Sequence, residues 1–382
     1  GKTVLEVAQT KYMDEIVSQG RIGLVKTIPN GMTPASDVAN LSIMGYDPKI
    51  YYRGRGPLEA ANMGIELKDF EVAFRCNTVT VSEDTMIDYS AGHITTKESA
   101  ILIRHLDKKL RKDSIRFYPG ISYRHLMIFQ AGSKEEAEVF CKIKCMPPHD
   151  IVGKKLSKNL PGGKGKDLLI NLMNSSRTFL QNHDVNKVRI DLGENPANMI
   201  WLWGQGIKPD MPSFKKLFGL TGSVISAVDL VNGIGTLIGL EPVKVPGATG
   251  YYDTNFKGKA EYALNALKEK DFVYVHVEAP DEAGHTGDVM AKITAIENFD
   301  KLVVGTIWDE IKDKADYKIM VLPDHATPIS VRSHTDEPVP FAVCGKDIAP
   351  DEAHVFTEKA SRASKLIMES GSDLIKYLVS GK

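Results

Sequence analysis

The sequence predicts an α/β protein in which a mostly parallel sheet is covered by helices on both faces. From about residue 207 onward, short apolar segments alternate with longer segments whose apolar residues recur at helical spacing. Such alternation is typical of parallel sheets, because the chain must cross the sheet between parallel strands. With 382 residues, of which 42% are hydrophobic and 25% charged, the chain is long enough for two domains with sizeable cores.

The first elements predicted are a helix, a strand and a second helix. Apolar residues recur at helical spacing through residues 4–19, and Gly20 follows where a helix would close. GLVKTI is then predicted as a strand, and the loop PNGMTPAS leads to a helix that begins near Ser36. From these residues alone, Ser36 is interpreted as a plain helix N-cap.

From about residue 66 the pattern becomes richer in strands. FEVAFRCNTVTV and IRFYPGISYRHLMIF are predicted as strand-forming segments, and helical stretches such as TTKESAILIRHLDKKL and SKEEAEVFCKIK alternate with them. The last part of the chain again alternates strands with helices. Its predicted strands are SVISAVD, DFVYVHVEA, YKIMVLPD and PVPFAVCG, and its longest predicted helix is DVMAKITAIENFDKLVVGTIWDEIKD.

Composition argues against several classes of function. Lys and Arg number 48 against 49 Asp and Glu, a net charge of −1, whereas a dedicated nucleic-acid binder normally shows a basic excess. No run of about 18 apolar residues would span a membrane, and the first residues lack the pattern of a secretory signal. Four scattered cysteines are too few for a disulfide framework. We therefore expect a cytoplasmic protein without nucleic-acid or membrane partners. Homo-oligomerisation is left open.

Polar residues that suit metal binding lie next to three of the predicted strands. VYVHVEAP runs into Asp281 and His285, YKIMVLP runs into Asp324 and His325, and His334 precedes PVPFAVCG. Ligands in open α/β sheets lie beyond the carboxyl ends of the strands, and a mixed carboxylate and imidazole set suits Zn²⁺, Mn²⁺ or a similar ion. We expect Asp281, His285 and His334 at one metal, with Asp324 and His325 at a second. Taken singly, each motif also fits a turn or a capping residue.

These residues lie in a chain that resembles a known family along essentially its whole length. The strings that carry the resemblance, besides the metal motifs, are SDVANLSIMGYDP, RGRGPLEAA, FRCNTVTV, PGISYRH, PPHDIVGK, WLWGQG and VPGATGYYDTNFKGKA. The chain closely resembles the archaeal-type cofactor-independent phosphoglycerate mutases, which need no 2,3-bisphosphoglycerate and belong to the alkaline phosphatase superfamily. The resemblance implies an alkaline-phosphatase-like parallel-sheet domain with a smaller inserted α/β domain.

The resemblance also implies a ping-pong mechanism. A serine beside two divalent metals takes the phosphoryl group from 3-phosphoglycerate and returns it to the other hydroxyl, giving 2-phosphoglycerate, a step of glycolysis and gluconeogenesis. By that analogy Ser36 is the nucleophile and a metal ligand, because a metal or a base has to activate a serine hydroxyl. Mn²⁺ is the ion expected first, with Mg²⁺ and Zn²⁺ as alternatives, and no 2,3-bisphosphoglycerate is expected.

Two domains with separate tasks follow from the resemblance. Residues 1–65 with 207–382 are expected to hold the metals, and residues 66–206 to supply cations for the substrate. Arginine is preferred for phosphate and carboxylate contacts, and the candidates for substrate binding are Arg75, Arg124, His125, Lys208 and Lys259. Each candidate also fits a structural ion pair.

Two other functions remain open at this point. A metal-dependent phosphomonoesterase of the same superfamily would use the same metals and serine and let water attack the phosphoserine. An inactive binding relative is the other alternative. In the family, the chain opens with a strand whose final Asp ligates the second metal. The sequence from Gly1 onward does not include this strand, and the protein would be an inactive relative if the strand were truly absent. We expect that this strand has been left out of the chain and that the enzyme is active.

Overall fold

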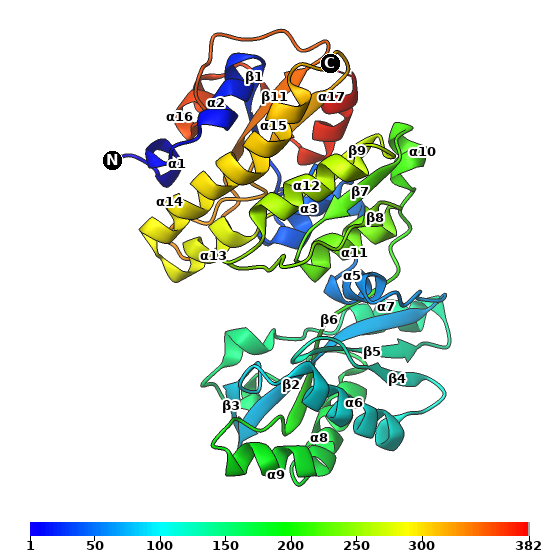
Figure 1. Ribbon diagram of the computed structural model, residues 1–382. Coiled ribbons are helices and arrows are strands. Elements are labelled where there is room, and N and C mark those ends of the chain that lie inside the picture. The colour runs from blue at the N-terminus through cyan, green and yellow to red at the C-terminus, as the bar shows by residue number, and fades with distance from the viewer. Residues whose placement is uncertain (381–382) are drawn as a thin grey trace. The chain divides into compact units, whose positions relative to one another are not determined.

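The computed structural model describes residues 1–380 and divides into two compact units, Gly1–Tyr52 with the chain from Met211 onward, and Arg53–Asp210 (Figure 1). The sequence predicts the domain boundaries between residues 65 and 66 and between residues 206 and 207. Helix α5 (Arg55–Asn62) accounts for most of this difference, because it packs within the second unit. A Cβ atom at Gly56 would lie only 2.2 Å from the carbonyl oxygen of Ala73, so a glycine is needed for this close approach.

Unit 1 contains two separate sheets. The first has the order β10-β11-β1-β12 and the second the order β8-β7-β9. The strands of unit 1 are β1 (Arg21–Val25), β7 (Gly222–Ile225), β8 (Glu241–Pro242), β9 (Phe272–Val275), β10 (Lys318–Val321), β11 (Val339–Gly345) and β12 (Ile367–Met368). The second sheet is parallel throughout, as its alternation with helices predicts. In the first sheet β11 runs antiparallel to both neighbours; for β10 the reason is that no helix crosses over between β10 and β11.

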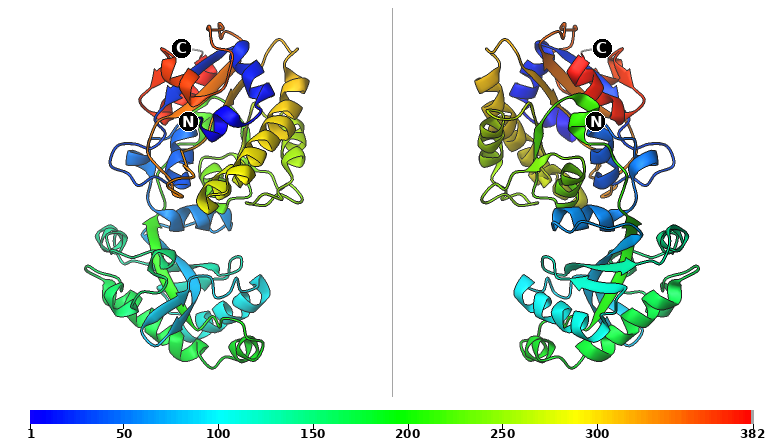
Figure 2. Two further views of the ribbon diagram at one scale, coloured as in Figure 1. Left: turned by 90° about the vertical axis from the view of Figure 1, so that its left-hand side faces the viewer. Right: turned by 90° about the vertical axis from the view of Figure 1, so that its right-hand side faces the viewer.

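The helices of unit 1 cover the four-stranded sheet on both faces (Figure 2). Apolar residues of α2 and α15 pack on one face, and those of α3 and α17 pack on the other. The helices are α1 (Val4–Val7), α2 (Lys11–Ser18), α3 (Ser36–Ile43), α4 (Pro48–Tyr51), α10 (Phe214–Phe218), α11 (Asp229–Leu237), α12 (Phe256–Ala266), α13 (Ala279–Thr286), α14 (Val289–Asn298), α15 (Gly305–Ile311), α16 (Glu358–Ala363), a 3-10 turn (Gly371–Asp373) and α17 (Leu374–Ser380). Within residues 1–380, no helix is both long and apolar enough to cross a membrane.

Two long helices predicted from the sequence are interrupted. The helix predicted over residues 4–19 is divided into α1 and α2, and Gly20 follows α2 as expected. The conformation of Gly20 is not left-handed; a Cβ atom there would lie 2.1 Å from the carbonyl oxygen of Val343. The helix predicted over residues 288–313 contains a π-helical segment, Phe299–Val304, between α14 and α15.

Unit 2 is built on one antiparallel sheet. Its central strand β2 pairs with β5 and β6 over most of its length and with β3 near its end. Helices α6 and α8 pack on one face of this sheet, and α5 packs on the other. The elements are α5, β2 (Glu71–Ser82), β3 (Thr85–Asp88), α6 (Thr96–Leu110), β4 (Ile115–Tyr118), β5 (Arg124–Gln130), α7 (Lys134–Cys141), two 3-10 turns (Pro148–Ile151 and Leu156–Lys158), α8 (Lys166–Leu180), α9 (Asp184–Asp191) and β6 (Met199–Ile207).

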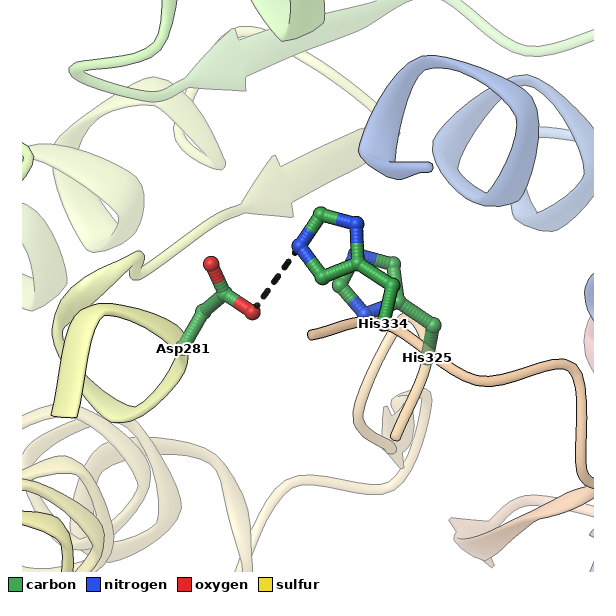
Figure 3. Close-up of side chains that lie close together, drawn as sticks. All are labelled: Asp281, His325 and His334. Carbon is green, nitrogen blue, oxygen red and sulfur yellow. Dashed lines mark ion pairs between the residues drawn. The ribbon is translucent and has the colours of Figure 1, made fainter. Parts of the chain in front are cut away.

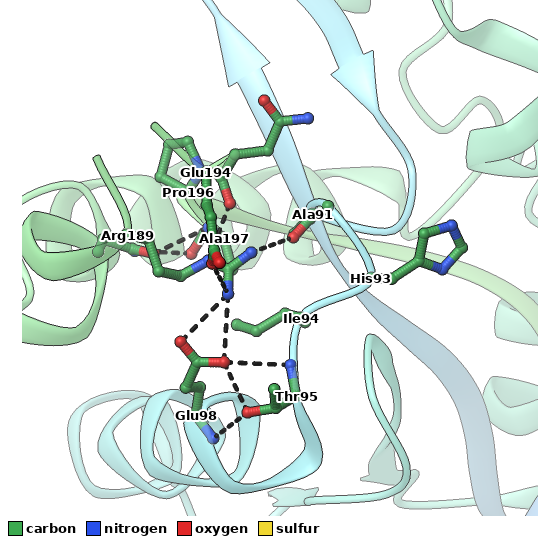
Figure 4. A network of polar contacts seen from close by, with 12 residues as sticks. Ala91, His93, Ile94, Thr95, Glu98, Arg189, Glu194, Pro196 and Ala197 are labelled. Carbon is green, nitrogen blue, oxygen red and sulfur yellow. Dashed lines mark hydrogen bonds and ion pairs between the residues drawn. The ribbon is translucent and has the colours of Figure 1, made fainter. Parts of the chain in front are cut away.

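A buried arginine holds one end of unit 2 together (Figure 4). The Arg189 side chain is 2% exposed, and its guanidinium lies 3.1 Å from Glu98 and 2.9 Å from Glu194. It also donates hydrogen bonds to the backbone carbonyl oxygens of Ala91 and Asn195, both at 2.9 Å. Since α9, α6 and the loop after β3 all meet at this one side chain, Arg189 is a structural residue of unit 2.

Candidate active site

The predicted metal motifs of unit 1 do follow strands. Strand β9 leads through His276 and Glu278 into α13, which carries Asp281 and His285 four residues apart on one helix face. Strand β10 is followed by Asp324 and His325, and His334 lies in the loop before β11. The α13 segment and the connection between β10 and β11 therefore bring their polar side chains to one region of the unit.

Asp281 contacts two histidines of this cluster, and Figure 3 shows it facing His334, with His325 beside that ring. Its carboxylate oxygens lie 3.1 Å from His285 Nε2 and 3.3 Å from His334 Nε2, and the two imidazole nitrogens are 2.9 Å apart. Burial opposes ionisation of Asp281, but hydrogen bonds from His285, His334 and Thr327 outweigh burial and lower its pKa. The hydrogen bond to Asp281 raises the pKa of His285 to about 9.

His325 approaches the same cluster. One ligand atom from each of Asp281, His325 and His334 lies within 4.8 Å of the others, and the rings of His325 and His334 have their centres 4.0 Å apart. The sequence grouped His325 with Asp324 at a second metal. In the structure His325 lies between the two groups, with its Nε2 atom 3.5 Å from an oxygen of Asp324.

This donor set fits a divalent cation. Imidazole nitrogens and carboxylate oxygens are the ligands that Mn²⁺ and Zn²⁺ accept, and here they converge within a few ångströms. The facing Nε2 atoms of His285 and His334 can share only one proton between them, whereas a cation could take a lone pair from each. Glu278, Asp281 and Glu282 form a second, overlapping group of possible ligands.

Ser36 lies at the edge of this cluster. It is the first residue of α3, whose N-cap is Ala35, and its side chain makes no capping bond. Its Oγ atom is instead 3.0 Å from His325 Nε2. The plain N-cap interpretation of Ser36 is therefore wrong, and the hydroxyl is directed toward the histidine.

A chain of hydrogen bonds determines which nitrogen of His325 carries the proton. The Thr327 hydroxyl donates its only proton to Asp281, an acceptor, so it must accept from His325 Nδ1 at 3.3 Å. When His325 is neutral, Nε2 is then unprotonated. Nε2 can accept the proton of the Ser36 hydroxyl or ligate a metal.

Two further ionisable groups near the cluster have strongly shifted pKa values. Burial, with smaller contributions from Asp281 and Asp324, raises the pKa of Glu278 to about 9. Burial also lowers the pKa of Lys259 to about 8, and this fully buried side chain donates to the His276 carbonyl oxygen at 2.9 Å. Lys259, a predicted substrate ligand, lies in unit 1 and has no exposed surface.

The other predicted substrate residues lie in unit 2. Asn77 on β2 is paired with Arg124 on β5, so Arg75, two residues from Asn77, lies on the same sheet face as Arg124. The Arg75 guanidinium is 4.4 Å from the ring centre of Trp203 and 2.8 Å from Glu59. Lys208 is half-exposed and pairs with Glu66 at 3.2 Å.

His125 differs from the expectation. Because it is adjacent to Arg124 in a strand, its side chain points to the opposite face of the sheet. It is 1% exposed, its Nδ1 atom accepts a hydrogen bond from Gly120 N at 3.0 Å, and burial lowers its pKa to about 3. An uncharged, buried imidazole on the opposite sheet face does not lie beside Arg75 and Arg124.

Several side chains near the candidate residues of each unit were not themselves predicted as site residues from the sequence. Asn40 and Thr27 hydrogen-bond to Asp324, Thr327 bonds to Asp281, and Tyr274 bonds to Asn40. In unit 2, the half-exposed His149 ring packs against Trp203 at 5.4 Å. Asn40, Tyr274, His149 and Trp203 occur in strings that mark the family resemblance, but only the structure shows which of their side chains converge.

Comparison with known proteins identifies the family. Residues 18–186 match a family model described as 2,3-bisphosphoglycerate-independent phosphoglycerate mutase. A curated protein of that name from Methanosarcina barkeri is 50% identical over 384 residues, which cover 100% of this chain and 95% of the relative. The chain belongs to this family. A relative from Geobacter sulfurreducens, named as a probable 2,3-bisphosphoglycerate-independent phosphoglycerate mutase, is 48% identical over 99% of this chain and 94% of its own length.

Solved structures share the fold of this chain. A Pyrococcus horikoshii protein superposes with a TM-score of 0.83 at 28% identity, covering 99% of this chain and 91% of its own. A cofactor-independent phosphoglycerate mutase from Thermoplasma acidophilum has a TM-score of 0.65 at 24% identity, covering 98% and 92%, and this likeness supports the fold. The α/β architecture predicted from the sequence, with its inserted unit, is the fold of these neighbours.

Proposed function

We propose that the protein interconverts 3-phosphoglycerate and 2-phosphoglycerate without 2,3-bisphosphoglycerate, by way of a phosphoserine at Ser36. The observation that supports this most directly is the position of the Ser36 hydroxyl, 3.0 Å from His325 in a cluster that suits divalent cations. The curated relatives carry the name of this activity. In this proposal the enzyme is cytoplasmic and serves glycolysis and gluconeogenesis.

Two divalent metal ions are part of the proposal. Asp281, His285 and His334 would hold one ion, and Asp324 and His325 would hold a second beside Ser36. Mn²⁺ is proposed first, with Mg²⁺ and Zn²⁺ as alternatives. When bound, such ions lower the pKa of a serine hydroxyl and offset the negative charge of a phosphoryl group.

The proposed chemistry is balanced without water or any other co-reactant. The Ser36 oxygen forms a bond to phosphorus while the ester bond to the C3 oxygen of the substrate breaks. The proton lost by the Ser36 hydroxyl is matched by the proton gained by the departing glycerate oxygen. The return step forms the ester at the C2 oxygen and restores the Ser36 hydroxyl. The α3 N-terminus, which begins at Ser36, presents backbone N–H groups where the phosphoryl group is attached.

Substrate binding is proposed for the cationic face of unit 2. Arg75 and Arg124 share a sheet face, and guanidinium groups are suited to paired contacts with carboxylate and phosphate oxygens. Lys208 is proposed as a peripheral substrate contact, whereas the fully buried Lys259, whose Nζ atom donates to the His276 carbonyl oxygen, is not proposed as one. Each of these assignments predicts a raised KM when the side chain is removed.

A single assay tests the proposed function. The protein is freed of metal with EDTA, then incubated with 3-phosphoglycerate with and without Mn²⁺, while 2-phosphoglycerate and free phosphate are both measured. We expect Mn²⁺-dependent 2-phosphoglycerate and no requirement for 2,3-bisphosphoglycerate. Free phosphate as the main product would identify a phosphomonoesterase, and no turnover with retained ligand binding would identify a binding protein. Activity that survives chelation would contradict the role of the metals.

A further inference from the structure

We infer that Asn40 is a positioning residue that connects the first turn of α3, which begins with Ser36, to Asp324. We also infer that the hydroxyl of Tyr274 sets the orientation of the Asn40 amide. The inference rests on the proposed function, because it assigns Ser36 and Asp324 their roles. It adds two residues to the site, neither of which would itself contact the metal or the substrate.

The Asn40 amide makes three hydrogen bonds and is completely buried. Its Nδ2 atom donates to the Ser36 carbonyl oxygen at 2.8 Å and to Asp324 Oδ2 at 2.8 Å. Its Oδ1 atom accepts from the Tyr274 hydroxyl at 2.6 Å. Both N–H bonds of the amide are therefore used, and one of them is to a carboxylate, which makes it a stronger, charge-assisted bond.

The Tyr274 hydroxyl decides which way the amide faces. If the amide were rotated by 180°, its oxygen would face the two oxygens of Ser36 and Asp324, and its NH₂ group would face the hydroxyl. Two acceptor–acceptor contacts in a buried site are costly. The Tyr274 hydroxyl therefore stabilises the amide orientation in which Nδ2 donates to both Ser36 and Asp324. Without this hydroxyl, the amide prefers that orientation less strongly.

Two further hydrogen bonds restrict the position of Asp324. Its second carboxylate oxygen accepts a hydrogen bond from the His325 backbone N–H at 2.9 Å, and its carbonyl oxygen accepts one from the Thr27 hydroxyl at 2.6 Å. The carboxylate is thus held from both sides, and Asn40 supplies the one side-chain bond that leads to the Ser36 segment.

The three residues come from three separate parts of the chain. Asn40 is in α3, Tyr274 is in β9 of the parallel sheet, and Asp324 follows β10 of the mixed sheet. A single primary amide thereby connects the two sheets of unit 1 to the helix that begins with Ser36. Its loss is expected to loosen the spacing between the Ser36 hydroxyl and Asp324 while all proposed ligands remain present.

Variants separate this positioning role from a general loss of stability. Tyr274→Phe removes only the hydroxyl, and Asn40→Leu replaces the amide by an apolar group of similar volume. Tyr46→Phe is the matched control, since the buried Tyr46 hydroxyl donates to the Pro212 carbonyl oxygen at 2.8 Å elsewhere in unit 1. Mn²⁺ binding to each metal-free protein is measured by calorimetry, together with kcat, KM and the thermal midpoint.

We expect Asn40→Leu to weaken one of two Mn²⁺ sites by about 10–100-fold and to leave the other within about twofold, as for other residues that orient metal ligands. Its kcat should fall at least about tenfold, with KM within about threefold. Tyr274→Phe should show a smaller change of the same kind. In Asn40→Leu the Tyr274→Phe change should have no further effect, because Tyr274 acts through Asn40.

The inference is overturned if Tyr274→Phe and Asn40→Leu bind Mn²⁺ at both sites as tightly as Tyr46→Phe does. It is also overturned if the effects of Tyr274→Phe and Asn40→Leu simply add. The Mn²⁺ measurement does not depend on turnover. A wild-type protein without mutase activity but with the expected site-selective loss would therefore contradict the proposed function and still support the positioning role.

Discussion

At the scale of single residues, the site is organised around a few side chains that each serve two neighbours. Thr327 connects Asp281 to His325, and His325 in turn faces Ser36. Because an imidazole with one proton has one donor and one acceptor nitrogen, this chain leaves the lone pair of His325 directed at the serine. The direction of the serine hydroxyl thus follows from the protonation of its neighbours.

Ser36→Ala should abolish mutase activity with little loss of stability. The Ser36 hydroxyl makes no helix cap, so its removal costs about 1 kcal/mol or less for the bond to His325, while turnover should fall at least about 10³-fold. Ser213→Ala is the control with the opposite expectation, because the Ser213 side chain does cap α10. Its loss should lower the free energy of unfolding by about 1 kcal/mol, with mutase activity retained. Mass spectrometry after incubation with 3-phosphoglycerate should find phosphate on residue 36. Phosphate on another residue would show that the nucleophile is misassigned.

Removal of either histidine beside Asp281 should remove one metal ion. His285→Ala and His334→Ala each lose a nitrogen that lies about 3 Å from Asp281, and tight Mn²⁺ binding should fall from two equivalents to about one. The exposed His354 in the same unit provides the control His354→Ala, which should keep both. Elemental analysis after dialysis measures the stoichiometry. Two equivalents retained in both active-site variants would refute the assignment.

At the scale of elements, contacts between helices explain where the sequence-based helices break. Helix α2 begins as a new helix after α1. In its first turn, the backbone N–H groups of Tyr12 and Met13 donate hydrogen bonds to the Asp300 carboxylate at 3.2 and 2.8 Å. Asp300 belongs to the π-helical segment between α14 and α15. A side chain from a distant helix therefore satisfies N–H groups that a local N-cap leaves free.

Asp300 should make stability depend on pH. Burial, opposed in part by the two N–H bonds, raises the pKa of Asp300 to about 6, above its value of about 3.9 in an unfolded chain. The folded protein then takes up a proton between about pH 6 and pH 4 that the unfolded chain does not. This contribution to stability is present at low pH and is lost as pH rises through 6.

The comparison of wild type with Asp300→Asn isolates this effect. Urea unfolding at pH 5 and pH 7.5 should show a larger free-energy advantage of the wild type at pH 5, since only the aspartate can titrate. Asp309→Asn, a change at an exposed carboxylate of α15, should show no such difference between the two pH values. An advantage that is equal at both pH values, or larger at pH 7.5, would contradict the raised pKa.

At the scale of the whole molecule, the proposed metal ligands and the two arginines proposed to bind substrate lie in different compact units. All the proposed metal ligands fall in unit 1, whereas Arg75 and Arg124 fall in unit 2. Each unit has its own sheet system and its own apolar core. A change in the core of unit 2 should therefore alter the stability of that unit without altering metal binding.

Arg189→Ala tests this division. The variant leaves Glu98 and Glu194 without their shared cation and two backbone carbonyls without a donor, which should cost about 2–4 kcal/mol. Lys187→Ala, at an exposed position of the same helix, should change stability by less than about 0.5 kcal/mol. Below the unfolding transition, Mn²⁺ should bind Arg189→Ala at both sites with wild-type affinity. A weakened Mn²⁺ site would show that the units are coupled more strongly than proposed.

From the sequence one can derive the α/β class, which follows from periodicity, and the positions of Asp281, His285, Asp324, His325 and His334 next to predicted strands, which follow from motifs. The family and the inserted unit were implied by the resemblance of long sequence strings. All of these signals are local in the chain. Only the tertiary structure decided that His325 approaches Asp281 and His334, that His125 faces away from Arg124, and that Asn40 joins Tyr274 to Asp324. The physical reason is that hydrogen-bond partners and sheet faces depend on strand register and on contacts across hundreds of residues, which no local pattern encodes.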